Sequence, residues 1–215
     1  MSVSAWCPWF VLCLATAGVP APELEGYRVL ARSPQAAQLV IAAREGMEQA
    51  FGGSSSNDGS ELEWPTPPCP VYVTLVSGHS TRACVGSDSP MGTLRQTVRA
   101  LGARVIDADR RRAPVRADEL PHLRVVIAFA GEGHTVSDPY TVDPAREGLR
   151  VESERGAVAF LPGEARTVRW ALGEARRLGV LSGSLSEARF TRFPVVVIQG
   201  AAAWPQPVPT TETHP

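Results

Sequence analysis

The stretch VYVTLVSGHSTRACVG, residues 71–86, predicts the element around which the rest of the chain folds. VYVTLV has the β-branched and aromatic composition of a strand, SGHS supplies a turn at Gly78 and His79, and TRACVG returns as a second strand. Because side chains alternate between the two faces of a strand, one face of the returning strand is apolar and the other is not. The pattern therefore predicts a β-hairpin with its apolar face in the core.

Cys84 lies on the returning strand, and its thiol is a potential nucleophile. It shares a face with Arg82, opposite the apolar face of Ala83 and Val85. A neighbouring arginine lowers the pKa of a thiol, and Gly86 would let a ligand approach the backbone. One interpretation is a nucleophilic or substrate-binding thiol with Arg82 as an anion clamp. The other is a small half-buried residue beside a structural arginine–carboxylate pair, because free cysteine is among the most buried residue types.

Outward from the hairpin, the sequence predicts helices and strands without a repeating βαβ unit. The helices carry apolar residues at helical spacing, and a continuous apolar run and a second hairpin supply further strands. The resulting class is α+β, with a mixed or antiparallel sheet and flanking helices. In chain order, the elements are a helix opened by Ser33 and Pro34 with its apolar face ending at Phe51, a helix over 93–106, a strand over 123–130, a hairpin over 148–162 turning at 154–156, a helix over 168–178 closed by Gly179, and a strand over 193–200.

Both ends of the chain are predicted to lie outside the folded domain, which we assign to residues 33–200. Residues 1–32 form a leader whose apolar run is too short to span a bilayer and ends in a small-x-small pattern typical of a secretory signal. The protein would be periplasmic or secreted if this leader is a signal peptide, and cytoplasmic otherwise, with no membrane association of the mature form. Residues 201–215 are proline-rich and predict a flexible tail.

Cys69 and Cys84 are expected to be free thiols. If Gly78 and His79 form the turn, Cys84 lies opposite about Val73, and Cys69 sits four residues further down the first strand. That separation exceeds the usual disulfide limit of about 7 Å between Cα atoms.

The composition excludes several classes of chemistry. The 215 residues have a net charge of −1, and the 21 basic residues are all arginine. A lysine Schiff base and a lysine-containing P-loop are therefore excluded. Nucleic-acid binding is disfavoured because no basic face is interleaved with aromatics. The four histidines have no metal-ligand spacing, and no nucleotide fingerprint follows a strand, so we expect neither a metal nor a cofactor.

Two further polar groups could contribute to a site. Arg110, Arg111 and Arg112 form the densest basic cluster and could grip an anion, but the surrounding carboxylates favour a solvated, self-paired loop. Glu164 follows Pro162 at the entry to a helix, where it would complement the helix dipole. If the second hairpin faces Cys84, Glu164 becomes a candidate acid/base group or polar anchor.

The order of these motifs resembles the AMMECR-domain family, over about residues 33–199. The family's hairpin reads roughly F-V-T-L, a short turn, then L-R-G-C-I-G, and residues 73–75 and 82–86 match it. A D-x-R-F-x-P-L loop is matched by residues 109–115, E-L-P-x-L-R by residues 119–124, and a G-L-x-V hairpin closing in L-L-P by residues 148–151 and 160–162. The chain departs from the family at Ala83 in place of glycine, at the arginine that replaces the loop phenylalanine, and after Pro162.

The resemblance implies an AMMECR-type fold with two subdomains of mixed α/β character; it does not imply an established activity. It also implies partners, a Memo-like protein and a radical-SAM protein, in a modification pathway. The leading hypothesis is a cleft protein of that pathway acting on an unknown small molecule or peptide. Cys84 and Arg82 would be central, with the remaining cleft residues being Gly86, Asp109, Arg110, Pro162 and Glu164. The alternative is a non-catalytic binding or interaction module in which Cys84 is structural. This module would lie outside the cytoplasm if the leader is a signal peptide.

Overall fold

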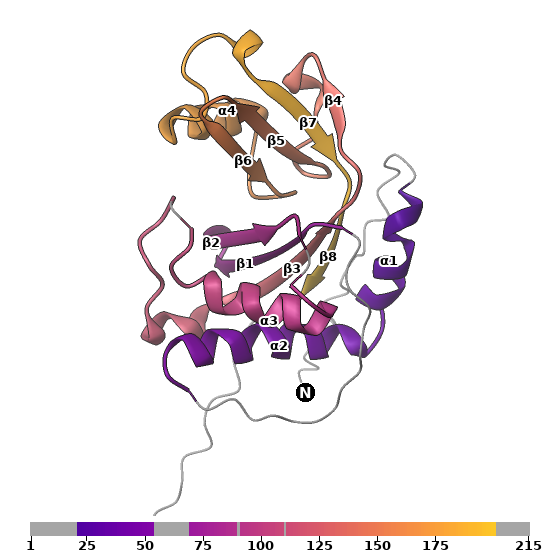
Figure 1. The fold of residues 1–215 in the computed structure, drawn as a ribbon, viewed down its shortest axis with the longest axis vertical. Helices are drawn as coiled ribbons and strands as arrows, with labels where there is room; N and C mark the ends of the chain where they lie inside the picture. Colours follow the sequence, from indigo (N-terminus) through magenta and orange to yellow (C-terminus); the bar gives the residue numbers. More distant parts are fainter. Residues whose placement is uncertain (1–20, 54–68, 90, 110, 201–215) are drawn as a thin grey trace, which may run out of the picture.

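The computed structural model describes residues 21–53, 69–89, 91–109 and 111–200, which form two four-stranded sheets (Figure 1). All strand pairs in both sheets are antiparallel. The predicted α+β class is confirmed, with one subdomain around each sheet. The predicted tail and most of the predicted loop at residues 52–60 lie outside the described residues.

The first sheet contains the hairpin predicted at residues 71–86 and has the strand order β2-β1-β3-β8. A bulge between Leu75 and Val76 shifts the register of the hairpin, so Cys84 lies opposite Thr74 instead of Val73. Cys69 and Cys84 are both free, as expected. The four strands are β1 (Val71–Ser77), β2 (Ser80–Ser87), β3 (Arg124–Ala130) and β8 (Val195–Gln199).

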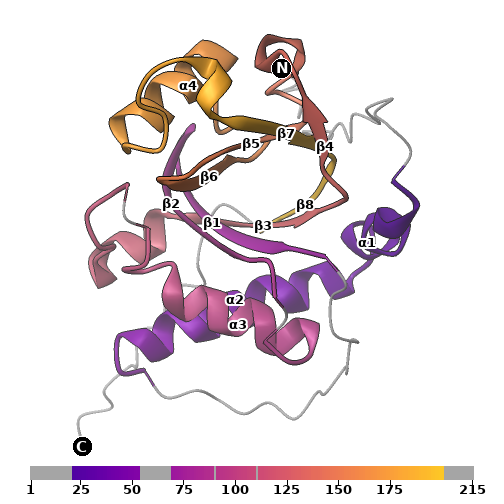
Figure 2. The same cartoon turned by 45° about the horizontal axis from the view of Figure 1, so that its top comes forward.

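Two helices, α2 (Gln35–Ala50) and α3 (Leu94–Arg104), cover the outer face of this sheet (Figures 1 and 2). Thr93 and Gln96 form a capping box that begins α3. The apolar faces of both helices are buried as predicted, except that Phe51 at the end of α2 is exposed. Ser33 does not cap α2 as predicted, because its hydroxyl donates to the carbonyl of Leu30 at the end of the preceding helix.

Glycines allow α2 and α3 to pack backbone against backbone. A Cβ added at Gly102 would lie 2.1 Å from the carbonyl oxygen of Ala43, and one added at Gly46 would lie 2.0 Å from that of Arg99. These distances are too short for any side chain, and backbone atoms cannot rotate away. The helices would have to separate to admit a methyl group at either position.

We therefore expect Gly102→Ala to lower the free energy of unfolding by about 1–3 kcal/mol, the usual cost of overpacking a core. The loss should appear although alanine is the better helix former. Urea unfolding measures it, and Gly173→Ala in α4 (Val168–Arg177) is the control, because a Cβ there has nothing within 4 Å. Equal stability of the two variants would contradict the close approach.

The folded part of the chain begins before residue 33, which corrects the predicted boundary of the leader. A 3-10 turn (Pro22–Leu24) and helix α1 (Glu25–Ala31) precede α2. Leu24 is fully buried in the core of the first subdomain, and the ring of Tyr27 stacks on that of Phe129 with centroids 4.2 Å apart. Helix α1 has only seven residues, too few for an apolar repeat that would distinguish it from a leader. Its contact with β3 can be seen only in the folded structure.

The second sheet has the strand order β4-β7-β5-β6 and packs on α4. The predicted hairpin is confirmed as β5 (Gly148–Ser153) and β6 (Gly156–Phe160). Two strands were not predicted, β4 (His134–Val136) and β7 (Arg189–Phe193). Both are short, and in β7 the two buried phenylalanines, Phe190 and Phe193, are three residues apart and break the alternation expected of a strand. Each becomes a strand because it pairs with the other, and β7 also pairs with β5. His134 is exposed on β4.

The inner faces of the two sheets meet across a third apolar cluster. It is built on Ala128, Ala130, Leu161 and Phe193, with Tyr72 and Cys84 among the half-buried residues packed against it. The chain crosses between the sheets twice, from β3 to β4 and from β7 through Pro194 to β8 (Figure 1). Cys84 therefore lies where the two subdomains meet.

Among the described residues, no helix has the length and apolarity needed to cross a membrane.

Candidate functional site

Cys84 lies on β2, at the free edge of the first sheet, and faces the second sheet. The predicted face assignment is confirmed, since Ala83 is buried in the core under the helices and Val85 packs against that core. The hydroxyl of Thr74, opposite on β1, lies 3.1 Å from the sulfur of Cys84. The backbone N–H of Cys84 points away from β1 and donates to Oδ2 of Asp109 at 2.8 Å.

Arg82 is held by a neighbouring loop. Its Nε and Nη2 donate to the two carboxylate oxygens of Glu119 at 2.6 and 2.9 Å. Nη1 and Nη2 also donate to the carbonyls of Ala113 and Pro114 at 2.9 and 3.0 Å. These bonds match the structural arginine–carboxylate pair that the sequence offered as an alternative to an anion clamp.

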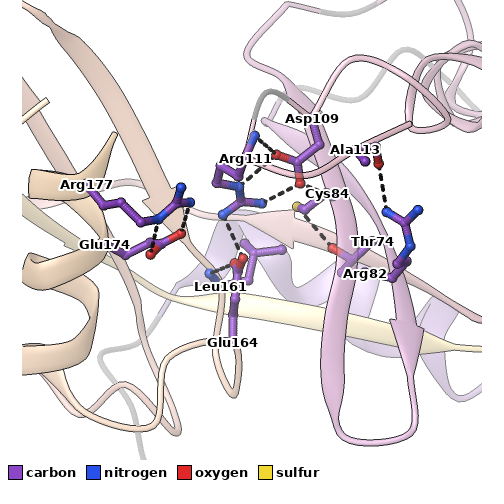
Figure 3. A network of polar contacts seen from close by, with 10 residues as sticks. All are labelled: Thr74, Arg82, Cys84, Asp109, Arg111, Ala113, Leu161, Glu164, Glu174 and Arg177. Atoms are coloured by element: carbon purple, nitrogen blue, oxygen red, sulfur yellow. Dashed lines mark hydrogen bonds and ion pairs between the residues drawn. The ribbon is translucent and has the colours of Figure 1, made fainter. Parts of the chain in front are cut away.

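An ion cluster formed by Asp109, Arg111 and Glu164 joins the two subdomains beside Cys84 (Figure 3). The Nε and Nη2 of Arg111 donate to Oδ1 and Oδ2 of Asp109 at 2.9 and 3.1 Å. Nη1 of Arg111 donates to Oε1 of Glu164 at 2.7 Å, and the N–H of Leu161 donates to the other oxygen of Glu164 at 3.1 Å. Arg111 thus bridges a loop of the first subdomain to the turn after β6.

This cluster is buried, which corrects the expectation of a solvated loop for this part of the basic run. The exposed fractions of the side chains are 13% for Arg111, 5% for Asp109 and 7% for Glu164. Arg112, the next residue, is exposed as expected. Buried charges need an opposite charge and hydrogen bonds, and here the single guanidinium of Arg111 provides both to the two carboxylates.

The pKa values in the cluster follow from burial and from Arg111. Burial disfavours the anion of Asp109, but hydrogen bonds and charge from Arg111 outweigh it and hold the pKa of Asp109 below its usual value. For Glu164 burial dominates, and its pKa is raised despite Arg111. Burial, followed by the charge of Glu164, raises the pKa of the Cys84 thiol to about 12.

The expectation that a neighbouring arginine would lower the pKa of Cys84 is therefore wrong. Arg82 is occupied by Glu119, and the guanidinium next to the thiol is that of Arg111, which is already neutralised by two carboxylates. At neutral pH Cys84 is a protonated thiol.

A cleft opens beside Cys84, between the edge of the first sheet and the inner face of the second. Its volume is about 220 Å³, and Tyr72 of the first sheet and Arg150 of the second are among the residues that line it. Arg150 is within 3.3 Å of Asp88 and 3.4 Å of Glu152. The lining residues are Tyr72, Gly86, Asp88, Arg150, Ala157, Val158 and Ala159.

The position of Gly86 in this wall requires a residue without a side chain. A Cβ at this position would lie 2.3 Å from the ring of Tyr72, so the glycine admits the tyrosine ring over the strand. Burial raises the pKa of Tyr72 to about 12, which keeps its hydroxyl protonated and able to donate a hydrogen bond. The polar side chains of the wall are therefore a protonated tyrosine, a guanidinium and the carboxylate of Asp88.

Most of the residues predicted for the site lie together. Cys84, Asp109 and Glu164 belong to one network, Gly86 lines the adjoining cleft, and Arg82 flanks it on β2. Pro162 is half-buried between Leu161 and the turn that holds Glu164, and Arg110 lies outside the described residues. Among the described residues, no cluster of histidine, cysteine and carboxylate side chains could hold a metal ion.

The sequence reasoning missed the central role of Arg111 and the contributions of Thr74, Tyr72 and Arg150. Thr74 and Tyr72 lie opposite Cys84 and Gly86 only because of the bulge after Leu75, which a regular pairing of the two strands does not predict. Arg111 and Arg150 also have no local signal. Their roles arise from contacts with Glu164 and Asp88, which lie 53 and 62 residues away in the chain.

Comparison with known proteins supports the family and the fold. A family model described as AMMECR1 matches residues 40–197, which include β2, Asp109, Arg111 and Glu164. The crystal structure of uncharacterized protein PH0010 from Pyrococcus horikoshii is similar with a TM-score of 0.58 at 19% sequence identity, covering 75% of this chain and 89% of that chain. At that identity the likeness concerns the fold alone. The search of curated proteins gives no match.

Proposed function

The chain belongs to the AMMECR1 family, and from this premise we propose that it is a binding component of a modification pathway. In this proposal the cleft between the two sheets receives a small molecule or a peptide segment. The observation that carries it is the cleft itself, in which the polar side chains of Tyr72, Asp88 and Arg150 lie among small residues. Ligand sites commonly have this form, a concave surface with few polar groups.

The ion cluster gives this cleft a fixed shape. Asp109 and Arg111 come from the first subdomain and Glu164 from the second, so their hydrogen bonds hold the two walls at one separation. Cys84 lies at the base of the cluster as a small, protonated residue that packs against the apolar contact between the sheets. Its role in the proposal is structural, and a preorganised cleft binds without the entropy cost of closing.

The partners in the proposal are a Memo-like protein and a radical-SAM protein, as the family resemblance implies. A binding component with a preformed cleft and an unreactive thiol would present its ligand for chemistry that a partner performs. Sedimentation of the purified chain with each partner tests this part. Absence of a complex with either one, with and without ligand, would contradict it.

A second candidate is thiol catalysis by Cys84. The observation that favours it is the proximity of the thiol to Glu164, a carboxyl whose raised pKa would let it carry a proton. Arg82 would then act at a distance, since Glu119 occupies its guanidinium. The thiol-labelling experiment described in the Discussion distinguishes the two candidates.

Cleft binding can be measured by NMR before any natural ligand is known. A mixture of N-acetylated amino-acid amides should shift the backbone amide signals of Tyr72, Gly86 and the 157–159 segment. Ala157→Leu, which places a larger side chain in the cleft, should reduce these shifts at least severalfold. Ala145→Leu, at an exposed position away from the cleft, is the control. If no probe moves the cleft signals, the binding proposal is wrong.

A further inference from the structure

Strand β6 presents unused backbone hydrogen-bonding groups toward the cleft. It is an edge strand, paired only with β5 in its sheet. The hairpin turns at two residues, with Ser153 opposite Gly156, and antiparallel pairs alternate between hydrogen-bonded and non-hydrogen-bonded. In this alternation Ala157 and Ala159 belong to non-hydrogen-bonded pairs. Their N–H and C=O groups therefore point away from β5, and both residues line the cleft.

The other sheet edges in the described part of the chain are protected. On β2, the outward N–H of Cys84 is already bonded to the carboxylate of Asp109. Helix α1 lies beside β8, and β4 is only three residues long (Figure 1). By contrast, β6 reads GAVAF, without the charge or proline that usually blocks an edge. An open edge of this kind accepts another strand.

The facing wall of the cleft suits an extended backbone. Residues two apart on a strand point the same way, so the N–H of Gly86 faces outward like that of Cys84. Gly86 lines the same cleft and has no side chain to obstruct an incoming chain. In both ribbon views, β6 is the strand of the second sheet drawn nearest to β2 (Figures 1 and 2). A strand placed along β6 would thus have backbone groups on one side and Gly86 on the other.

The charges beside β6 indicate what such a strand would carry. Arg150 stands between Asp88 and Glu152, so this group has an excess of one negative charge. The side chains of Asp88 and Glu152 are 60% and 45% exposed, against 35% for Arg150. The accessible charge is therefore acidic, and it is complementary to a basic side chain.

We propose that β6 is a docking strand for a partner protein, which adds an extended peptide segment with a basic residue to the open edge of the second sheet. The proposal rests on the cleft-binding function above and names its ligand class. Main-chain bonds to Ala157 and Ala159 supply affinity, and Asp88 and Glu152 favour arginine or lysine on the incoming strand. Small apolar side chains on that strand fit against the alanines.

The test uses a synthetic peptide, acetyl-Thr-Val-Arg-Val-Thr-amide, and two N-methylated forms of it. One form is methylated on the first, third and fifth nitrogens and the other on the second and fourth, so each removes the donors of one strand edge. One form should bind at least about tenfold more weakly than the parent peptide, and the other should bind like it. A glutamate in place of the arginine should also weaken binding.

Variants of Ala157 test the same contact from the protein side. Ala157→Pro removes an outward N–H without removing a bond to β5, and should reduce peptide affinity at least about tenfold. Ala157→Gly keeps that N–H and adds no bulk to the cleft, so it shows how much of the loss comes from the change of side chain alone. In the wild-type protein, saturating peptide should slow hydrogen exchange at the amides of Ala157 and Ala159, a measurement that does not depend on the proline variant folding.

The outcomes separate this proposal from cleft binding in general. If both methylated peptides bind equally and Ala157→Pro binds normally, strand addition is wrong while the cleft remains a binding site. If no peptide binds and the amino-acid amides also leave the cleft signals unmoved, both proposals are wrong. If the protein alone forms dimers that Ala157→Pro dissolves, the strand's occupant is a second copy, and the peptide proposal is overturned.

Discussion

Cys84 should react with a thiol reagent about a thousandfold more slowly in the native protein than in the unfolded one at pH 7. The pKa of its thiol is raised from 9.0 to about 12, and the thiolate is the reactive form. At neutral pH, each unit by which the pKa rises lowers the fraction of thiolate about tenfold. Because the folded pKa is high, the rate should climb by about tenfold per pH unit above pH 7 without levelling before the protein unfolds.

The measurement requires a chain in which Cys84 is the sole thiol, with serine at Cys7, Cys13 and Cys69. The same chain in urea gives the rate of the unprotected thiol. A chain that keeps only Cys69 is a second control, because burial also raises the pKa of that thiol. A native rate close to the unfolded one, or a plateau near pH 7, would contradict the structural role and favour thiol catalysis.

Removing Arg111 should lower the free energy of unfolding by about 3–5 kcal/mol, the usual cost of leaving a buried charge without its partner. Arg111→Met leaves Asp109 and Glu164 facing each other with exposed fractions of only 5% and 7%. Urea unfolding at pH 7 measures the loss. Arg112→Met, one residue along the same loop and exposed, is the matched control and should change stability by less than about 0.5 kcal/mol.

The loss should shrink as the pH falls. In the wild type, Arg111 holds the pKa of Asp109 below its usual value, so Asp109 contributes stability above pH 3.8 that disappears as the pH falls through the folded pKa. Without Arg111, burial raises the pKa of both carboxyls, so the folded variant binds more protons than the unfolded chain. Its stability then rises relative to the wild type between pH 7 and pH 4. A gap that is constant over this range would contradict the assignment.

Local patterns were sufficient for the helices and hairpins. Residues 71–86 carry two strands and a two-residue turn, and the apolar spacing of α2, α3 and α4 follows the helical period. The elements that sequence reasoning missed are those without such a pattern. β4 and β7 are short and lack a two-residue alternation, and α1 becomes part of the fold only because Leu24 and Tyr27 pack against β3 and its neighbours.

The residues of the site also fall into those that the sequence indicated and those that only the structure identified. Strand parity placed Cys84 opposite the apolar face, the family resemblance brought Asp109 into consideration, and its place after Pro162 at a helix entry brought in Glu164. Parity could not show which arginine lies near the thiol. Arg82 is closest in sequence but turns to Glu119, whereas Arg111 reaches Asp109 and Glu164.

The sequence alone thus determined the α+β class, the hairpin that carries Cys84 and the face on which Cys84 lies, because these depend on periodicities within single elements. The tertiary structure decided the charge state of the thiol, the burial of Arg111 and the open edge of β6 beside the cleft. Each of these depends on groups far apart in the chain, whose desolvation and pairing are defined only once the two sheets have met.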